Sequence, residues 1–507
     1  MTKNFKLVLA MVLSLMMVLS SVAMAEVPTS QTIANGNAPD ATTGKYTISV
    51  PSGDTHNYEV YQIITGTLIA GETKLGNPAW GSSVGTTEAA ADVKDFIENI
   101  KNLSGPALVD AVKAKATASS IGQVDASTSL DVVPGYYMLV DVTDPLDEGD
   151  AKSLNIIAVF NDIEIAAKRS TTESDKKVDD NDTDKAADGS EWIDSADYNI
   201  GDTVPYKLSA TIAEDYANYT KGYKLSFHDD MGPGLTFGGS VTVKVDGTKI
   251  DSGYTLVTTG LTDNCEFEVR FANLKDIAAV HSGSVITVEF NAILNDQAVM
   301  TNAGNPNKSW VTYTNNPNDD QAGENGKTPD DTVIVFTYKT VFTKKDGAGK
   351  TLTGADFTLE KKVGTEWVNV TALHEGTDAK NPTKTGDSSG FTFTFAGLDA
   401  GDYKLTETET PTGYNTIDPI EFTITATHDI ESDNPTLTAL TGTDGAKFNM
   451  TPVLASGELD ADVINEQGAA LPSTGGIGTT IFYVAGSILV LAAAILLITK
   501  RRMGVND

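Results

Sequence analysis

The stretch Phe391-Thr392-Phe393-Thr394-Phe395 alternates aromatic and hydroxyl side chains over its whole length. In an extended strand this pattern puts the aromatic rings on one face and the threonines on the other, because successive side chains point to opposite sides. The stretch Ser240–Val245 alternates in the same way, and similar short segments, interrupted by Gly, Asn, Asp and Pro, recur between Thr42 and Val463. The sequence therefore predicts a mainly β protein built of tandem β-sandwich domains.

The first third of the chain carries a second pattern. Val93, Phe96, Ile97 and Ile100 recur at the spacing of one helix face, and residues 106–116 are also rich in helix formers. We therefore expect helices to be added to the β structure of the first domain.

The N-terminus has the layout of a secretory signal peptide. Lys3 and Lys6 precede an apolar run, and small residues follow it up to Ala25. We expect this segment to be removed, so that the mature protein begins near Glu26.

An apolar segment also lies near the C-terminus. The uncharged stretch Ile481–Thr499 is long enough to cross a bilayer once, and three basic residues, 500–502, follow it directly. This charge pattern predicts that the tail stays in the cytoplasm while the rest of the chain lies outside the cell.

Composition limits the function classes. The net charge of -33 argues against nucleic acid as a partner and favours a soluble, self-repelling surface protein. The single cysteine, Cys265, cannot form a disulfide within the chain, which is unusual for a secreted multidomain protein, so we expect another kind of covalent cross-link. The five histidines show no paired ligand spacing. We therefore expect no cofactor, no resident metal and no enzymatic turnover.

One acidic segment has the spacing of oxygen ligands in a calcium loop. Its residues are Asp180, Asp182, Asp184, Asp188 and Glu191. Lys185 stands where the sharp turn of such a loop requires Gly, so the sequence favours a solvated acidic loop and keeps calcium binding as the alternative.

The pentapeptide Leu471-Pro472-Ser473-Thr474-Gly475 lies just before the apolar C-terminal segment. Together with that segment and the basic tail, it resembles the sorting signal of surface proteins that sortases attach to Gram-positive cell walls. The resemblance implies that a sortase cysteine attacks the Thr474 carbonyl, releases the chain from Gly475 onward, and passes the acyl group to an amine. Peptidoglycan or another subunit would supply that amine.

The segment from Tyr403 to Tyr414, Tyr-Lys-Leu-Thr-Glu-Thr-Glu-Thr-Pro-Thr-Gly-Tyr, closely resembles the E-box of collagen-adhesin B-type domains in surface pilins. That family has an immunoglobulin-like sandwich with a lysine on an early strand and an asparagine shortly before the sorting signal. The resemblance implies an amide bond between Lys344 and Asn465, with Glu407 as proton shuttle. Burial is required for this reaction, because desolvation lowers the pKa of a lysine and raises that of a carboxylic acid.

A second resemblance covers the middle of the chain. The segments Ile200–Tyr206, Phe227–Asp229 and Gly234–Phe237 are similar to the fimbrial isopeptide-forming domain of major pilins, in which a lysine, an aspartate and an asparagine follow in that order. Strand alternation leads us to assign these roles to Lys176, Asp229 and Asn315. Lys177 remains the alternative to Lys176, since a slip of one residue exchanges which lysine points inward.

A polymerising pilin must also offer an amine to the sortase acyl-enzyme. In major pilins this amine belongs to a lysine at the end of the first domain, and Lys168 stands at that place. The Tyr-Pro pair that usually precedes it is replaced here by Ala166-Ala167, so an ordinary exposed lysine remains the alternative.

The resemblance as a whole implies the shaft subunit of a covalent pilus, with sortase, other copies of the chain and peptidoglycan as partners, and with minor pilins and host surface molecules as further contacts. The alternative is a monomeric or minor adhesin that Thr474 attaches to peptidoglycan. The expected segments are a signal peptide at 1–25, an N-terminal pilin domain at 26–170, a middle domain at 171–337, an E-box domain at 338–466 and the sorting signal with its membrane segment at 467–507.

Overall fold

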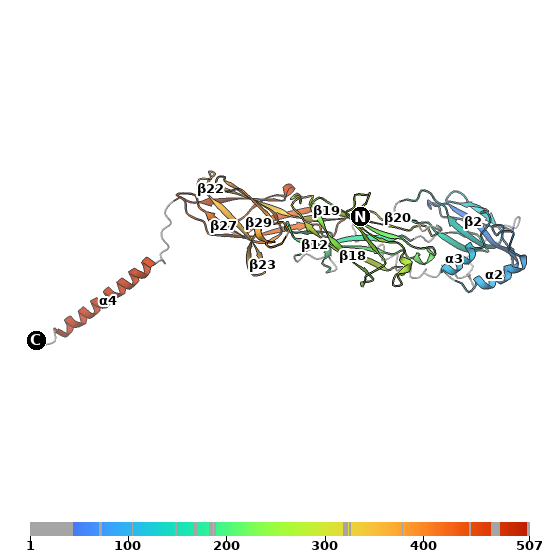
Figure 1. The fold of residues 1–507 in the computed structure, drawn as a ribbon, viewed down its shortest axis with the longest axis horizontal. Coiled ribbons are helices and arrows are strands. Elements are labelled where there is room, and N and C mark those ends of the chain that lie inside the picture. The colour runs from blue at the N-terminus through green and yellow to red at the C-terminus, as the bar shows by residue number, and fades with distance from the viewer. Residues whose placement is uncertain are drawn as a thin grey trace.

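The computed structural model describes residues 44–69, 74–103, 105–147, 150–165, 170–181, 186, 189–317, 323, 326–377, 379–445, 448–467 and 477–503. Strands dominate these residues, and three β-rich domains lie end to end in an elongated molecule (Figure 1). We call them the first domain (44–165), the middle domain (170–336) and the last domain (338–467). The predicted mainly β fold is confirmed.

The first domain combines two small sheets with two helices. Its strands are β1 (Tyr46–Ser49), β2 (Tyr58–Leu68), β3 (Leu75–Trp80), β4 (Gly122–Val124), β5 (Leu130–Val132), β6 (Gly135–Asp141), β7 (Leu154–Val159) and β8 (Ile163–Glu164). The larger sheet has the order β3-β2-β6-β7, with β4 also on β2, and the smaller sheet has the order β5-β1-β8.

The helices of the first domain are α2 (Val93–Ile100) and α3 (Gly105–Lys113), and the short 3-10 helix η1 (Ala90–Asp92) precedes α2. Val93, Phe96 and Ile100 of α2 are buried in one apolar cluster with residues of α3 and of the larger sheet. The helical spacing seen in the sequence therefore marks the face that packs on the sheet.

The middle domain is a sandwich of two sheets. Its strands are β9 (Glu173–Asp179), β10 (Trp192–Ile193), β11 (Ser195–Asp197), β12 (Thr203–Thr211), β13 (Leu225–Met231), β14 (Leu235–Val245), β15 (Thr248–Ile250), β16 (Thr255–Val257), β17 (Phe267–Phe271), β18 (Val285–Leu294), β19 (Asn305–Tyr313), β20 (Gly326–Lys327) and β21 (Asp331–Phe336). One sheet has the order β10-β9-β12-β18-β14-β15. The other has the order β11-β21-β19-β13-β17-β16, with β20 on β19. Two 3-10 helices, η2 (Tyr216–Asn218) and η3 (Leu274–Asp276), lie in its loops.

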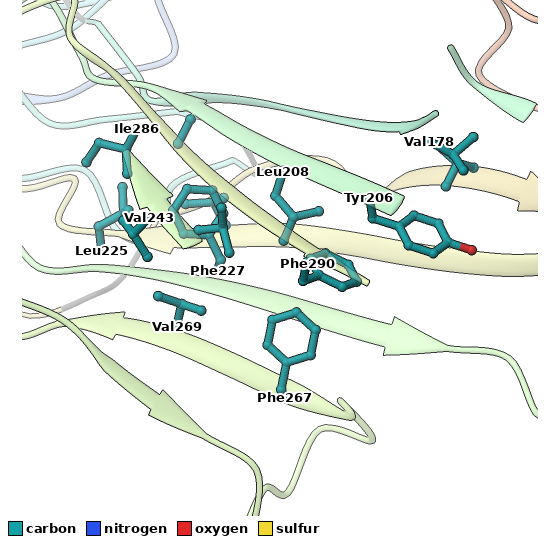
Figure 2. Packing of buried hydrophobic residues seen from close by; sticks show 14 of the residues in the cluster. Val178, Tyr206, Leu208, Leu225, Phe227, Val243, Phe267, Val269, Ile286 and Phe290 are labelled. Carbon is teal, nitrogen blue, oxygen red and sulfur yellow. The ribbon is translucent and has the colours of Figure 1, made fainter. Parts of the chain in front are cut away.

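Alternating apolar residues of both sheets meet between them. Figure 2 shows Tyr206, Leu208 and Phe290 from one sheet facing Phe227 and Phe267 from the other. All five side chains are buried. The polar residues of the middle-domain site, described below, are buried in this apolar core.

The last domain is a second sandwich. Its strands are β22 (Tyr338–Asp346), β23 (Asp356–Val363), β24 (Glu366–Asn369), β25 (Thr383–Thr385), β26 (Thr392–Leu398), β27 (Gly401–Glu409), β28 (Ile420–His428), β29 (Leu437–Thr443), β30 (Thr451–Val453) and β31 (Glu458–Asn465). The two sheets have the orders β25-β26-β22-β31-β30 and β24-β23-β27-β28-β29. Two 3-10 helices, η4 (Val370–Ala372) and η5 (Leu454–Ser456), complete it.

The first and last strands of the last domain are neighbours. β22 and β31 pair in parallel over eight residues, from Lys339 opposite Glu458 to Asp346 opposite Asn465. On the adjacent β26, Phe393 and Phe395 are buried, as the alternation around them predicts, whereas Phe391 lies before the strand and is exposed.

Beyond the last domain, helix α4 (Ile477–Met503) contains the apolar C-terminal segment. Its stretch Ile481–Arg501 has a mean hydropathy of 2.7 and makes no buried contact with the rest of the molecule. By length and composition this helix can cross a membrane.

Candidate functional site

Lys344 points into the core of the last domain. Along β22 the buried and half-buried residues alternate, so that Lys344 lies on the same inward face as Thr340 and Phe342. Its side chain is fully buried. A lysine in such a place needs polar partners, because an uncompensated buried charge is strongly destabilising.

Lys344 meets the two residues that the sequence predicts for it. Its Nζ donates to Oδ1 of Asn465 and, at 3.0 Å, to the Val463 carbonyl. Nδ2 of Asn465 donates to both carboxyl oxygens of Glu407, at 2.9 and 3.1 Å. The Lys344 Nζ lies 3.9 Å from the nearer Glu407 oxygen. The carboxamide is therefore held between the amine and the acid.

Burial also changes the protonation of this amine. It lowers the pKa of Lys344 from 10.5 to about 8, although the Glu407 carboxyl opposes the change. The Oε2 atom of Glu407 is fixed by the Thr410 hydroxyl at 3.2 Å and by the Ile417 N–H at 3.1 Å. The arrangement can support attack of a neutral amine on a polarised carboxamide.

The middle domain contains a second buried lysine. Lys176 on β9 is fully buried, and its Nζ donates to Oδ2 of Asp229 on β13 at 2.6 Å. The rings of Tyr206 and Phe290, labelled in Figure 2, lie 5.7 and 5.8 Å from the same Nζ. Burial lowers the pKa of Lys176 and raises the pKa of Asp229, in each case against the attraction of its partner.

Lys177 points the other way. It is half-buried and forms ion pairs with Asp194 and, at 3.2 Å, with Asp175. Burial alone would lower the pKa of Lys177, but the two carboxylates outweigh it and raise that pKa. Of the two lysines that the sequence left open, Lys176 is the one that faces the core.

The structure does not place Asn315, the predicted third member of this set, beside Lys176 and Asp229. The register of β13 with β19 pairs Asp229 with Ser309 and Met231 with Asn307. Asn315 lies six residues beyond Ser309, about 20 Å along an extended chain. It contacts the first domain instead, where its Nδ2 donates to the Asp150 carbonyl at 3.1 Å. Alternation identified the correct face of the strand but not the position along it.

Asn307 is the asparagine beside Asp229. It is fully buried, and its side chain acts on the Asp229 carboxyl to lower that group's pKa, against the larger effect of burial. Neither Oδ1 nor Nδ2 of Asn307 has a hydrogen-bond partner within 3.5 Å among the described residues. A buried carboxamide in this state costs about 1–3 kcal/mol per unsatisfied group. Sequence reasoning missed Asn307 because only the strand register reveals it.

Several predicted residues lie outside the described part of the chain. They are the signal peptide, Lys168, the pentapeptide 471–475, and Asp182, Asp184 and Asp188 of the acidic segment. At the two ends of that acidic segment, Asp180 is buried and Glu191 is exposed.

Three protein families match this chain. Residues 200–317 match the Gram-positive pilin backbone subunit 2, Cna-B-like domain, and residues 339–436 match the prealbumin-like fold domain. Residues 464–503 match the LPXTG cell wall anchor motif. The matched ranges contain Lys344, Glu407 and Asn465 of the last domain and Asp229 and Asn307 of the middle domain, whereas Lys176 lies before them.

A curated relative is the trypsin-resistant surface T6 protein of Streptococcus pyogenes serotype M6. It is 25% identical over 367 residues, which are 60% of this chain and 65% of the relative, so the match spans less than two thirds of that protein's length.

Solved structures of similar shape include the T6 backbone pilin of S. pyogenes serotype M6, with 17% identity and a TM-score of 0.48, and the major pilin SpaD of Corynebacterium diphtheriae, with 17% identity and a TM-score of 0.45. Each covers 84% of this chain and 98% of the solved one. The chain therefore carries a domain that matches the Gram-positive pilin backbone over residues 200–317 and a cell wall anchor motif over residues 464–503, which indicates a pilin-related protein anchored to the cell wall at the cell surface.

Proposed function

We propose that this protein is the shaft subunit of a covalent pilus, in which sortase joins Thr474 of one subunit to Lys168 of the next. Amide bonds within each subunit stabilise its domains. The observation that carries the proposal is the buried contact of Lys344 with Asn465, with Glu407 on the far side of the carboxamide. A chain with one cysteine gains from these amides the covalent cross-links that disulfides give other secreted proteins.

In the last domain the neutral amine of Lys344 attacks Cγ of Asn465. Glu407 accepts hydrogen bonds from Nδ2 of the carboxamide and carries the proton from the amine to the leaving group. A C–N bond forms to Lys344, the original C–N bond of Asn465 breaks, and ammonia leaves. The lowered pKa of Lys344, about 8, supports this step because the reactive neutral form is then accessible near neutral pH.

In the middle domain Lys176 reacts in the same way with Asn307, and Asp229 carries the proton. The raised pKa of Asp229 and the lowered pKa of Lys176 support a pair in which the acid and the amine are both neutral before reaction. The burial of Asn307 next to Asp229 also supports this bond, because it holds a carboxamide beside the acid that the buried amine already contacts.

The shape of the molecule supports head-to-tail assembly. The last domain lies at the opposite end of the molecule from the first domain (Figure 1), and the anchor motif follows the last domain. Lys168 falls in sequence between Ile165, the last described residue of the first domain, and Ser170, the first of the middle domain. A linkage from Thr474 to Lys168 would place the first domain of one subunit beside the end of another.

The test is an immunoblot of muramidase-released wall material, boiled in SDS, from cells with the native protein or with Lys168→Ala. We expect a ladder of high-mass forms for the native protein and single subunits for the variant. A ladder in both samples would move the linking amine to another lysine. Monomer alone in both would contradict the pilus and favour the wall-anchored adhesin.

A further inference from the structure

The junction between the middle and last domains holds its side chains in fixed positions. Only Thr337 separates β21 from β22, so one chain segment runs from sandwich to sandwich. Backbone hydrogen bonds also cross the junction, from Ile200 N–H to the Gly397 carbonyl at 3.0 Å and from Asp194 N–H to the Ile430 carbonyl at 2.9 Å. Side chains from both domains therefore meet in a rigid setting.

An acidic cluster with one histidine is buried in this junction. Asp180 and Asp197 come from the middle domain, and Asp399 and His428 come from the last domain. None of the four is more than 8% exposed. One ligand atom from each of Asp180, Asp197 and His428 lies within 4.8 Å of the others.

The hydrogen bonds of Ser195 determine which ring nitrogen of His428 carries the proton. Ser195 Oγ donates its single hydrogen to the Asp429 carbonyl at 2.8 Å. It must therefore accept from Nδ1–H of His428, 2.7 Å away. In the neutral ring, Nε2 then presents a lone pair toward the carboxylates and lies 3.9 Å from Oδ2 of Asp180. A second hydrogen bond that orients the ring in this way is typical of metal-binding histidines.

Asp399 adds an independent observation. Its Oδ2 accepts from Lys361 at 2.6 Å and from Asn181 at 3.1 Å, but its Oδ1 has no hydrogen-bond donor among the described residues. Asp399 lies beside the Asp197 carboxylate, so acids from the two domains meet in this junction.

The chemistry of the donor atoms indicates the class of cation. An imidazole nitrogen with carboxylate oxygens suits Zn²⁺ or Mn²⁺ better than Ca²⁺ or Mg²⁺, which prefer oxygen ligands alone.

We propose that Asp180, Asp197 and His428 bind one divalent transition-metal cation, with the Asp399 carboxylate beside it, and that this cation joins the middle domain to the last domain. The site differs from the alternative calcium loop of residues 180–191, although Asp180 belongs to both sets. It is also independent of pilus assembly, since none of its residues takes part in the amide or sortase steps.

The test uses the full chain purified in detergent, stripped with a chelator, dialysed and titrated with Zn²⁺ by calorimetry. We expect one Zn²⁺ to bind per chain with an affinity that falls at least ~10–100-fold in His428→Gln and in Asp197→Asn. Mn²⁺ should give an electron paramagnetic resonance signal with nitrogen coupling that His428→Gln removes. The exposed His281, changed to Gln, is the matched control and should leave binding intact.

A second group, His228, Asp263 and Cys265, is the other metal-compatible set among the described residues, so His228→Gln is tested in parallel. The proposal is overturned if the native chain binds neither Zn²⁺ nor Mn²⁺, a result that needs no folded variant. It is also overturned if His428→Gln, folded by circular dichroism, binds like the native chain, or if His228→Gln alone abolishes binding. A chain that binds no cation and loses stability as pH rises would instead hold a shared proton between Asp197 and Asp399.

Discussion

The two lysine sites assemble the same three groups from different strands. In the last domain, Lys344 and Asn465 lie on adjacent parallel strands of one sheet, and Glu407 reaches them from the facing sheet. In the middle domain Lys176 comes from one sheet, whereas Asp229 and Asn307 lie on two neighbouring strands of the facing sheet. Both sites bury a lysine close to a carboxyl group, but different strands supply the groups. The proposed chemistry therefore depends on position in the core, which different topologies can supply.

The largest expected effect comes from removing the acids. In Glu407→Ala and in Asp229→Ala we expect one of the two amides not to form. The mass of each variant should then be higher, by one molecule of ammonia, than that of the same variant with both amides formed, and its free energy of unfolding should fall by about 5 kcal/mol. Intact-mass spectrometry and denaturant unfolding measure both. Because the sites lie in separate domains, the two losses should add in the double variant.

Glu409→Ala is the matched control for the last domain, since Glu409 is on the same strand as Glu407 but exposed. The mass of Glu409→Ala should be lower than its sequence mass by two molecules of ammonia, which means that both amides have formed. Equal cross-linking in Glu407→Ala and the native chain would contradict the assigned role of Glu407.

The register of the middle domain gives the second test. Asn307→Ala should abolish the cross-linked peptide that contains Lys176 and lower the free energy of unfolding by about 5 kcal/mol. Asn315→Ala removes one contact with the first domain and should cost only about 1 kcal/mol. Peptide mass spectrometry after digestion identifies the cross-link. A Lys176 cross-link that survives Asn307→Ala and disappears in Asn315→Ala would reverse this assignment.

A third test uses pH. In Asn465→Ala, Lys344 stays a buried amine, and its folded pKa of about 8 lies below its unfolded value near 10.5. The unfolded chain then binds more protons between these two values, so the stability of the variant should rise as pH increases from about 8 to 10.

If Lys344 forms the proposed amide in the native chain, it does not titrate there, so the same pH range should bring no such rise for the last domain. Thermal unfolding at several pH values measures the difference. Parallel pH curves for the two proteins would mean that Lys344 is equally free in both.

The smallest effect is expected at Lys177. Its ion pairs with Asp175 and Asp194 are only partly buried, so Lys177→Ala should cost no more than about 1 kcal/mol and leave the middle-domain amide in place. Lys176→Ala should remove the amide. If mass spectrometry instead finds the bond lost in Lys177→Ala, the inward-facing lysine has been misassigned.

The sequence was more informative about the last domain than about the middle domain for a physical reason. Lys344, Glu407 and Asn465 each lie in a short motif or next to the anchor, so local pattern alone locates them. Asn307 lies on the same face of β19 as Ser309, Val311 and Tyr313. Alternation alone cannot tell which residue on that face lies opposite Lys176. Strand register depends on contacts across the sheet, which one strand's sequence does not contain. The cluster around His428 was hidden in the same way, since its members are far apart in the chain.

The pairing of β22 with β31 has a mechanical consequence. If both proposed amides form, a pull on Thr474 enters at Asn465, crosses to Lys344 and leaves through β22, so residues 345–464 carry none of the force. In the middle domain the same pull passes from β22 back to Asn307, crosses to Lys176 and reaches Lys168, which relieves residues 177–306. The first domain lies outside this path altogether. Between the two amides only the segment 308–343 remains to be stretched, and this segment crosses the domain junction at Thr337, beside the buried acidic cluster.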